Sequence, residues 1–296
     1  MKLSLVNRDI VTLIAFGKDF LSSRGVLYPE RESKYLLFSL LEVYYDKNSL
    51  LEELIDNKIK ESFYDLLKKR GQRYPLSYLE KKMDFYGLNL HISPGVFIPR
   101  QETELLVDNI CVFLKNQNQE SLHNKVFWDV CCGSGCIGLA IKNKFPQIKV
   151  FLSDISDKAV ELTKINASKN NLSVEVLKGN LFEPFKNLTC DYFCCNPPYL
   201  SYKDIFKTDP EVRCFEPWVA LVGGPLGTEF YSKIAPFLFK KLKKSGAAWM
   251  EIGYNQGNSV KEIFKKINWK GTVLKDFSNN DRFFFLEGDK RDVYSR

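Results

Sequence analysis

The stretch DYFCCNPPYL, Asp191 to Leu200, places an asparagine and two prolines directly after an apolar run. A short apolar run is typical of a buried strand, and proline ends a strand because it has no backbone N–H to donate. The side-chain oxygen of Asn196 is a hydrogen-bond acceptor, and the carbonyl of Pro197 is held rigid by the ring that follows it. Two acceptors at one strand end favour a site that holds an NH2 group, although the bare motif is also compatible with a simple strand end.

Tyr199 adds a flat aromatic face on which a planar amide or base can pack. An amide nitrogen is a poor nucleophile, so a reaction at that atom needs the nitrogen held in line with an electrophile. We therefore expect Asn196, Pro197 and Tyr199 to carry the chemistry, and Asn196, Pro197, Pro198 and Tyr199 to bind the substrate.

A glycine-rich loop lies upstream, in VFWDVCCGSGCIGLA. Gly133, Gly135 and Gly138 fit G-x-G-x-x-G after a strand, and Asp154 follows 21 residues after Gly133. This pattern by itself is compatible with a dinucleotide site, in which the acidic residue binds the ribose. It is a weak signal, because other nucleotide-binding α/β proteins also place small residues in this turn.

Asp129 favours a different cofactor, because its carboxylate at the strand end should face the ligand crevice. A pyrophosphate would be repelled there, whereas the cationic amino acid and sulfonium of S-adenosylmethionine would be attracted. Asp154 would then accept hydrogen bonds from the ribose, and Asn180 and Leu181 would lie beside the adenine. Asn180 is equally compatible with a plain turn residue. Since cysteine disfavours positive φ, we expect ordinary backbone geometry at Cys131.

Composition limits the remaining choices. The chain has 296 residues, of which 45% are hydrophobic and 27% charged, with a net charge of +7. Its eight cysteines form no C-x-x-C pair and its histidines number two, so we expect reduced, mostly buried thiols and no metal site. Arg8 and Asp9 interrupt the N-terminal apolar stretch, and no run reaches the length of a membrane helix. We expect a cytoplasmic protein.

The elements that position these motifs fall into three parts. Residues 1–75 show apolar residues at helical spacing, with breaks at Gly25, Pro29 and DKNS, and predict a small all-helical domain. Residues 76–95 predict a hairpin linker with its turn at Gly87. Residues 96–296 predict a seven-stranded Rossmann-like α/β domain. Its strands are expected at 126–130, 148–153, 173–178, 191–195, 247–252, 271–277 and 282–287, the first five parallel and the last two an antiparallel edge pair.

Taken together, these motifs resemble the protein-(glutamine-N5) methyltransferases that modify peptide chain release factors, the PrmC/HemK family. The resemblance covers nearly the whole chain and follows the family's order through RYPLSYL, ISPGVFIPRQETELLV, DVCCGSG, SDIS, NPPYL, EVRCFEPWVALVGG, MEIGYNQG and DRFFF. N-P-P-Y alone is shared with adenine-N6 methyltransferases, so the combination carries the specificity.

The resemblance implies a class I methyltransferase fold and methyl transfer from S-adenosylmethionine to the glutamine of the release factor G-G-Q motif. It implies that the helical domain engages the release factor, that Phe97, Arg100 and Thr103 help close the pocket, and that Glu216 and Glu251 organise it. We expect a monomer that needs no nucleic acid. The expected cofactor contacts are Asp129, Cys131, Cys132, Gly133, Ser134, Gly135, Asp154, Asn180, Leu181 and Asn196.

The sequence departs from the family pattern at three positions: Cys131 replaces a common glycine, Leu226 a usual aspartate and Gln101 a usual proline. Four alternatives stay open on sequence alone. They are an adenine-N6 nucleic-acid methyltransferase, a glutamine methyltransferase for a ribosomal protein, an NAD-dependent oxidoreductase and a binding module without activity. IPRQETE favours the release factor enzyme over the ribosomal one.

Overall fold

The computed structural model describes residues 2–44 and 55–291, so the predicted break at DKNS and the first residues of the third predicted helix lie outside it. The chain divides into two units. The first consists of residues 1–81 together with Pro210–Phe215, and the second consists of Lys82–Asp209 and residues 216–296. Among the described residues, no helix is both long and apolar enough to cross a membrane.

All regular elements in the described part of the first unit are helices. Its helices are α1 (Lys2–Ser22), α2 (Pro29–Tyr44), α3 (Asn57–Gly71), α4 (Leu76–Glu80) and α8 (Pro210–Phe215). Helix α3 begins where the Asp56 carboxylate accepts the Ile59 N–H at 2.8 Å, which satisfies one of the unpaired donors of the first turn. The apolar faces of α1, α2 and α3 bury a core that includes Leu21, Leu36 and Phe63.

A buried ion-pair network ties α8 to the other helices of the first unit. Arg70 of α3 pairs with Glu32 of α2, and its guanidinium also lies 2.9 Å from a carboxylate oxygen of Glu211 in α8. Arg73 contacts the second oxygen of Glu211 at 2.7 Å. The rings of Tyr74 and Phe215 meet edge to face at 5.1 Å. Charge and aromatic packing therefore fix this six-residue segment within the helical unit.

The second unit opens with an antiparallel hairpin, β1 (Lys82–Phe85) and β2 (Leu88–His91). Tyr86 and Gly87 form its two-residue turn, and both have positive φ, of 48° and 80°. Two successive positive φ values match the turn type that suits the twist of a hairpin.

A seven-stranded sheet forms the body of the second unit, in the order β10-β11-β9-β6-β3-β4-β5. Strands β3, β4, β5, β6 and β9 run parallel, and β11 is antiparallel to both β9 and β10. The predicted Rossmann-like sheet is thus confirmed, with the fourth parallel strand beside the first. The strands are β3 (Val126–Val130), β4 (Lys149–Asp154), β5 (Glu175–Lys178), β6 (Cys190–Cys195), β9 (Leu242–Glu251), β10 (Trp269–Lys275) and β11 (Asp281–Arg291), and a small pair adds β7 (Leu200–Ser201) and β8 (Val222–Gly224).

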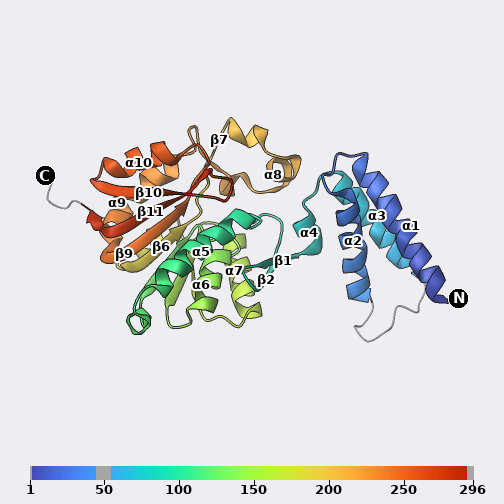
Figure 1. The fold of residues 1–296 in the computed structure, drawn as a ribbon, viewed down its shortest axis with the longest axis horizontal. Helices are drawn as coiled ribbons and strands as arrows, with labels where there is room; N and C mark the ends of the chain where they lie inside the picture. The colour runs from blue at the N-terminus through green and yellow to red at the C-terminus, as the bar shows by residue number, and fades with distance from the viewer. Residues whose placement is uncertain (1, 45–54, 292–296) are drawn as a thin grey trace. The chain divides into compact units, whose positions relative to one another are not determined.

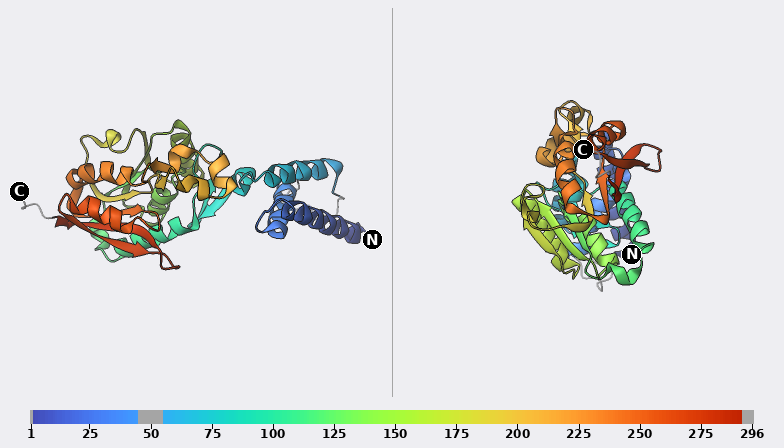
Figure 2. Two further views of the ribbon diagram at one scale, coloured as in Figure 1. Left: turned by 90° about the horizontal axis from the view of Figure 1, so that it is seen from above. Right: turned by 90° about the vertical axis from the view of Figure 1, so that its left-hand side faces the viewer.

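Helices cover both faces of this sheet (Figure 1). One layer contains α5 (Gln101–Lys115), α6 (Cys136–Lys144) and α7 (Asp157–Lys169), in green, and the opposite layer contains α9 (Glu229–Lys241) and α10 (Gly257–Lys265), in orange. Both layers can be followed from two further directions in Figure 2. Four short 3-10 turns complete the unit: Gln119–Leu122, Glu183–Phe185, Asp204–Lys207 and Trp218–Ala220. Coverage on both faces explains why every residue of β6 is buried and apolar or paired.

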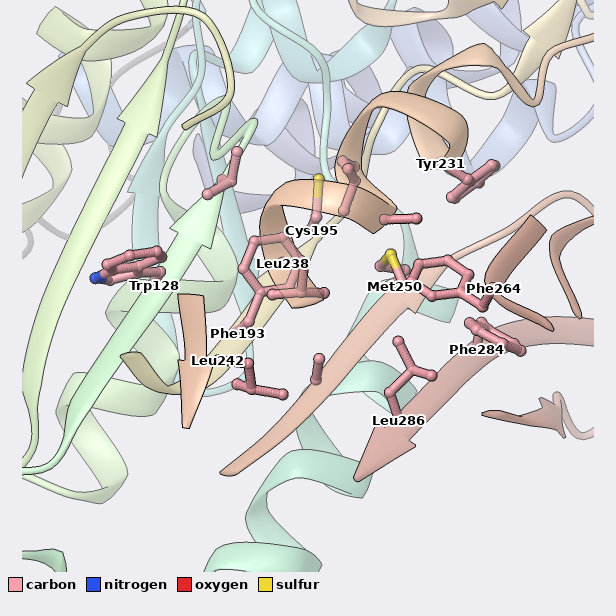
Figure 3. Close-up of a cluster of buried hydrophobic side chains, with 14 of the residues drawn as sticks. Trp128, Phe193, Cys195, Tyr231, Leu238, Leu242, Met250, Phe264, Phe284 and Leu286 are labelled. Atoms are coloured by element: carbon pink, nitrogen blue, oxygen red, sulfur yellow. The ribbon is translucent and has the colours of Figure 1, made fainter. Parts of the chain in front are cut away.

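One apolar core of the second unit lies between the sheet and the α9–α10 layer (Figure 3). Tyr231 and Leu238 of α9 and Phe264 of α10 pack against Phe193 of β6 and Met250 of β9. These side chains hold the central strands rigid up to their carboxyl ends. The loops that follow those ends carry most of the motifs that the sequence singles out.

Candidate active site

The carboxyl ends of β3, β6 and β9 lie side by side. Val130, the last residue of β3, is paired with Cys195, the last residue of β6, and Cys195 is paired with Met250 of β9. The glycine loop, the NPPY segment and Glu251 therefore begin at one edge of the sheet. Such an edge is where α/β proteins bind ligands.

Asn196 is held by a buried carboxylate. Its side-chain NH2 donates to Oε2 of Glu251 at 2.9 Å, and Glu251 is only 1% exposed. Thr103 of α5 donates its hydroxyl to the same oxygen at 2.9 Å. Because the NH2 end of Asn196 is engaged, the Oδ1 end is the one left to accept a hydrogen bond.

The rest of the NPPY segment is also fixed. The Tyr199 hydroxyl donates to Oε1 of Glu251 at 3.2 Å, and the Tyr199 carbonyl accepts from Nε2 of Gln256 at 2.8 Å. The Leu200 N–H donates to the Leu221 carbonyl at 2.9 Å. Within the described ranges 2–44 and 55–291, the Pro197 carbonyl has no hydrogen bond in the structure, so it stands as an acceptor beside Asn196.

Two glycines, one in β8 and one in the loop after it, make close approach to this segment possible. A Cβ on Gly223 would lie 2.3 Å from the Pro198 carbonyl oxygen, and one on Gly227 would lie 2.3 Å from the Tyr199 carbonyl oxygen. Both distances are far below van der Waals contact, so the sequence GGPLG can hold the NPPY backbone only with glycine at these two places. Sequence reasoning assigned no role to Gly223, Gly227 or Gln256, although GYNQG is a motif of the resemblance.

The glycine loop turns sharply after β3. Cys131, Gly133 and Gly135 all have positive φ, of 60°, 57° and 81°. The expectation of ordinary backbone geometry at Cys131 was therefore wrong. The turn needs a left-handed residue there, and it is maintained by hydrogen bonds from the Cys132 N–H to the Ser153 carbonyl at 3.0 Å and from the Gly135 N–H to the Cys132 carbonyl at 2.8 Å.

Asp129 is fully buried beneath this loop. Its Oδ2 accepts the Gly138 N–H at 2.8 Å, at the start of α6, while no described residue bonds Oδ1. Burial raises the pKa of Asp129 to about 7, against the lowering effect of the Gly138 N–H, and nearby Asp154 raises it further. The sequence suggested that this side chain faces an open crevice. In the structure it is buried instead, and one of its oxygens lacks a partner among the described residues.

Asp154 ends β4 and supports the loop from the other side. Its Oδ2 accepts the Gly133 N–H at 2.9 Å, and its Oδ1 accepts the Ser156 N–H at 2.9 Å. Burial raises its pKa, which the backbone N–H groups oppose. Each carboxylate oxygen keeps a second lone pair, so Asp154 can still accept from a bound hydroxyl.

Asn180 and Leu181 follow β5, at the far side of the same edge. Leu181 has a positive φ of 50°, and Asn180 donates its backbone N–H to Glu183 at 3.0 Å while its side chain is exposed. Ser134 and Cys132 are buried within the glycine loop, and the Ser134 hydroxyl lacks a partner among the described residues. The expected cofactor residues therefore line the ends of β3, β4 and β5, and Asn196 follows β6.

The segment before α5 is fixed by Glu216. Arg100 forms an ion pair with Glu216, and the Ile98 N–H donates to its Oε2 at 3.1 Å. The Arg100 guanidinium lies 4.6 Å from the centre of the Phe97 ring. Glu216 thus binds Arg100 just before α5, and Glu251 binds Thr103 in the first turn of α5.

Comparisons with known proteins identify the family of the chain. The family model "Methyltransferase small domain" matches residues 88–209. A release factor glutamine methyltransferase of Chlamydia trachomatis serovar L2 is 44% identical over 96% of both chains. The chain belongs to the release factor glutamine methyltransferase family.

More distant relatives support the same family and fold. A release factor glutamine methyltransferase of Thermodesulfovibrio yellowstonii is 34% identical over 88% of this chain and 93% of its own. Among solved structures, the 16S rRNA N2 G1207 methyltransferase of T. thermophilus, in complex with AdoMet and guanosine, is similar with a TM-score of 0.51 and 16% identity. It matches 70% of this chain and 49% of its own. That likeness concerns the fold alone.

Proposed function

We propose that this enzyme transfers a methyl group from S-adenosylmethionine to the side-chain nitrogen (N5) of the glutamine in the G-G-Q motif of peptide chain release factors. Family membership supports the reaction class. The observation that carries the proposal is the orientation of Asn196, whose NH2 is bound by Glu251 while Oδ1 remains an acceptor beside the Pro197 carbonyl.

The glycine loop fits S-adenosylmethionine. A Cβ at Gly133 would have only Val96 nearby, at 4.0 Å, so the backbone there is open to a ligand. Asp129 and Ser134 each have a buried oxygen without a protein partner among the described residues, and the ionised form of Asp129 has the charge that suits a cationic ligand. Asp154 supplies acceptors for ribose hydroxyls. Cys131, Cys132, Gly135, Asn180, Leu181 and Asn196 are the further residues that we propose to contact the cofactor.

S-adenosylmethionine, when bound, supplies a methyl group on a positively charged sulfur and leaves as a neutral thioether that keeps the bonding electron pair. In the proposed mechanism Asn196 Oδ1 and the Pro197 carbonyl each accept one hydrogen of the glutamine NH2. These two bonds fix the nitrogen in line with the methyl group, which lowers the entropic part of the barrier. Pro198 keeps the segment stiff, and Tyr199 offers its ring to the planar amide.

The nitrogen forms its new bond to carbon with its own lone pair and gives up one of its two protons. The two acceptors attract the N–H protons and so shift bonding electrons toward the nitrogen. One proton can then pass to solvent as the bond to carbon forms, and no strong base is required. None of the three residues that we propose to carry the chemistry, Asn196, Pro197 and Tyr199, has a side chain that acts as a strong base at neutral pH. This agrees with a mechanism that depends on positioning.

We further propose that the helical domain, residues 1–75, engages the release factor, with residues 76–95 as a linker and 96–296 as the catalytic domain. We place the monomeric enzyme in the cytoplasm. The cysteines agree with a reducing compartment, since all are free thiols and most are buried.

The test uses purified release factors and S-adenosylmethionine labelled on the methyl group. We expect the label on the G-G-Q glutamine by mass spectrometry, and a loss of transfer of at least about 100-fold in Asn196→Ala with cofactor binding only partly weakened. Asn116→Ala, which truncates an exposed asparagine at the end of α5, is the matched control and should transfer normally. Label on nucleic acid or on a ribosomal protein instead of any release factor would overturn the proposal.

A further inference from the structure

Glu251 binds three side chains from two other elements through one buried carboxylate. Thr103 comes from α5, Asn196 and Tyr199 come from the loop after β6, and Glu251 itself ends β9. Its backbone carbonyl is also bonded, by the Tyr231 hydroxyl of α9 at 2.8 Å. A carboxylate accepts hydrogen bonds and donates none, so each side chain that contacts Glu251 must turn a hydrogen-bond donor toward it.

The selection matters most for Asn196, because the two ends of an asparagine amide have nearly the same shape. A rotation of 180° about the last side-chain bond would exchange Oδ1 and Nδ2. The rotated form would present a donor to the substrate NH2, and two donors repel each other. In the structure the Nδ2 end is bound by Glu251, so the rotated form would set Oδ1 against a carboxylate oxygen.

We propose that Glu251 is a positioning residue, which fixes the amide of Asn196 so that Oδ1 faces the substrate amide. The inference rests on the proposed function, because it assumes that Asn196 holds a substrate NH2. Glu251 is not the base of the reaction, since both of its oxygens already accept hydrogen bonds from protein side chains. Its negative charge also polarises Asn196, which makes Oδ1 a stronger acceptor.

The electrostatic surroundings of Glu251 determine when it is charged. Burial raises its pKa, while the hydroxyls of Thr103 and Tyr199 and the charge of Arg282 on β11 lower it, and Glu102 on α5 raises it. The remaining titratable neighbours are neutral: burial raises the pKa of Tyr231 and of the thiols of Cys136 and Cys194. Protonation of Glu251 at low pH would turn one oxygen into a donor and release the constraint on Asn196.

The first test replaces the carboxylate with an amide of the same size. Asn196 and Tyr199 donate to different oxygens of the carboxylate, and Glu251→Gln keeps an acceptor at only one of these two places. When its NH2 takes the place of Oε2, Asn196 loses its acceptor and can rotate. We expect kcat for release factor methylation to fall about 100-fold, with the KM for the release factor and the Kd for S-adenosylmethionine changed less than threefold. Asp191→Asn is the matched control, because Asp191 is a buried carboxylate near the opposite end of β6. It should keep the wild-type kcat in the folded fraction.

The second test is the pH dependence of kcat. Because the charged form of Glu251 is required, activity should be lost as the pH falls through its raised pKa, and Glu251→Gln should lack this acidic limb. Thr103→Val removes a hydrogen bond that lowers the pKa of Glu251, so it should move the limb upward by about one pH unit. A purely structural role of Glu251 would leave the position of the limb unchanged.

Each outcome decides the question. A kcat for Glu251→Gln within threefold of wild type, or an acidic limb that does not move in Thr103→Val, overturns the inference. If Glu251→Gln does not fold, as judged by circular dichroism, the shift in Thr103→Val decides alone. Failure of the wild-type enzyme to methylate any release factor would instead refute the proposed function, so the two failures are distinguishable.

Discussion

At the scale of single residues, we expect the protonation of the buried Asp129 carboxylate to make ligand binding at the glycine loop depend on pH. Burial raises its pKa to about 7 from an ordinary value of 3.8, so the free protein is only partly ionised there near neutral pH. A cationic ligand beside the carboxylate would favour the charged form and lower this pKa on binding. Proton binding and cofactor binding are therefore opposed.

We expect the affinity for S-adenosylmethionine to increase as the pH rises through about 7, and to level off above that range. The sign follows because the ionised carboxylate binds the cation and the protonated one does not. Calorimetric titrations between pH 6 and 8.5 measure the effect. Asp129→Asn should give a flat profile, and a pH-dependent affinity in that variant would assign the titration to another group.

The positive φ of Cys131 predicts an inverted order of stability between two small substitutions. In ordinary strand or loop geometry an alanine variant is more stable than a glycine variant, because glycine loses more backbone entropy on folding. At a φ of 60° the Cβ is strained, so Cys131→Gly should be more stable than Cys131→Ala by about 1 kcal/mol.

Denaturant unfolding of the two variants checks this order. Both lose the thiol, so the difference isolates the backbone term. Equal stability, or a more stable alanine variant, would mean that Cys131 does not hold a left-handed conformation in solution.

At the scale of elements, β8 with the loop after it and the loop after β9 together hold the NPPY segment in place. Gly223 lies against the Pro198 carbonyl, and Gln256 bridges the carbonyls of Tyr199 and Gly227, at 2.8 and 3.2 Å. The same glutamine accepts the Gly253 N–H at 2.9 Å. The backbone of the proposed substrate site is thus held by two loops that contact no substrate in our proposal.

Gly223→Ala should displace this backbone, because the new methyl group would lie 2.3 Å from the Pro198 carbonyl oxygen. We expect kcat to fall about 100-fold, since a shift of about 1 Å at a positioned site has that effect, while the Kd for S-adenosylmethionine stays within threefold. Methylation kinetics and calorimetry on the folded variant measure both. Leu226→Ala in the loop after β8 is the control, because its side chain is 74% exposed, and it should behave as wild type.

The sheet was predictable because alternating strands and helices imply parallel pairing, and the glycine loop and Gly87 mark their turns by composition. Strand β9 begins at Leu242, earlier than the predicted 247, since Lys243 within KKSG pairs with buried Asp191 at 2.9 Å. A contact between residues so far apart in the chain produces no pattern in the sequence around either residue. Glu251 and Asn196 are also far apart in the chain, so the sequence did not indicate that they bind each other. The prediction of ordinary backbone geometry at Cys131 was wrong.

At the scale of the whole molecule, the first unit is discontinuous in sequence. Its closing segment, α8, is joined to α3 by Glu211, which meets Arg70 and Arg73. The pKa of Glu211 is lowered by hydrogen bonds from both arginines, although burial opposes this. Arg70 is nearly fully buried, so the loss of a partner would leave part of its charge uncompensated.

Glu211→Gln should lower the free energy of unfolding of the helical unit by about 2 kcal/mol. Amide hydrogen exchange in α3 measures the change, and the strands β3 and β6 should keep their protection. Glu61→Gln alters an exposed carboxylate of α3 and serves as the control, with no expected change. Equal exchange in both variants would show that the α8 contacts do not stabilise these helices.

The discontinuity of the helical unit has a consequence for the order in which the protein folds during its synthesis. Glu211 follows Arg70 by 141 residues, so at roughly 5–20 residues per second the ribosome needs about seven to thirty seconds to supply it. During that interval Arg70 has only Glu32 as a carboxylate partner among the described residues of α1–α4. The helices that leave the ribosome first are therefore completed only after most of the second unit has been synthesised.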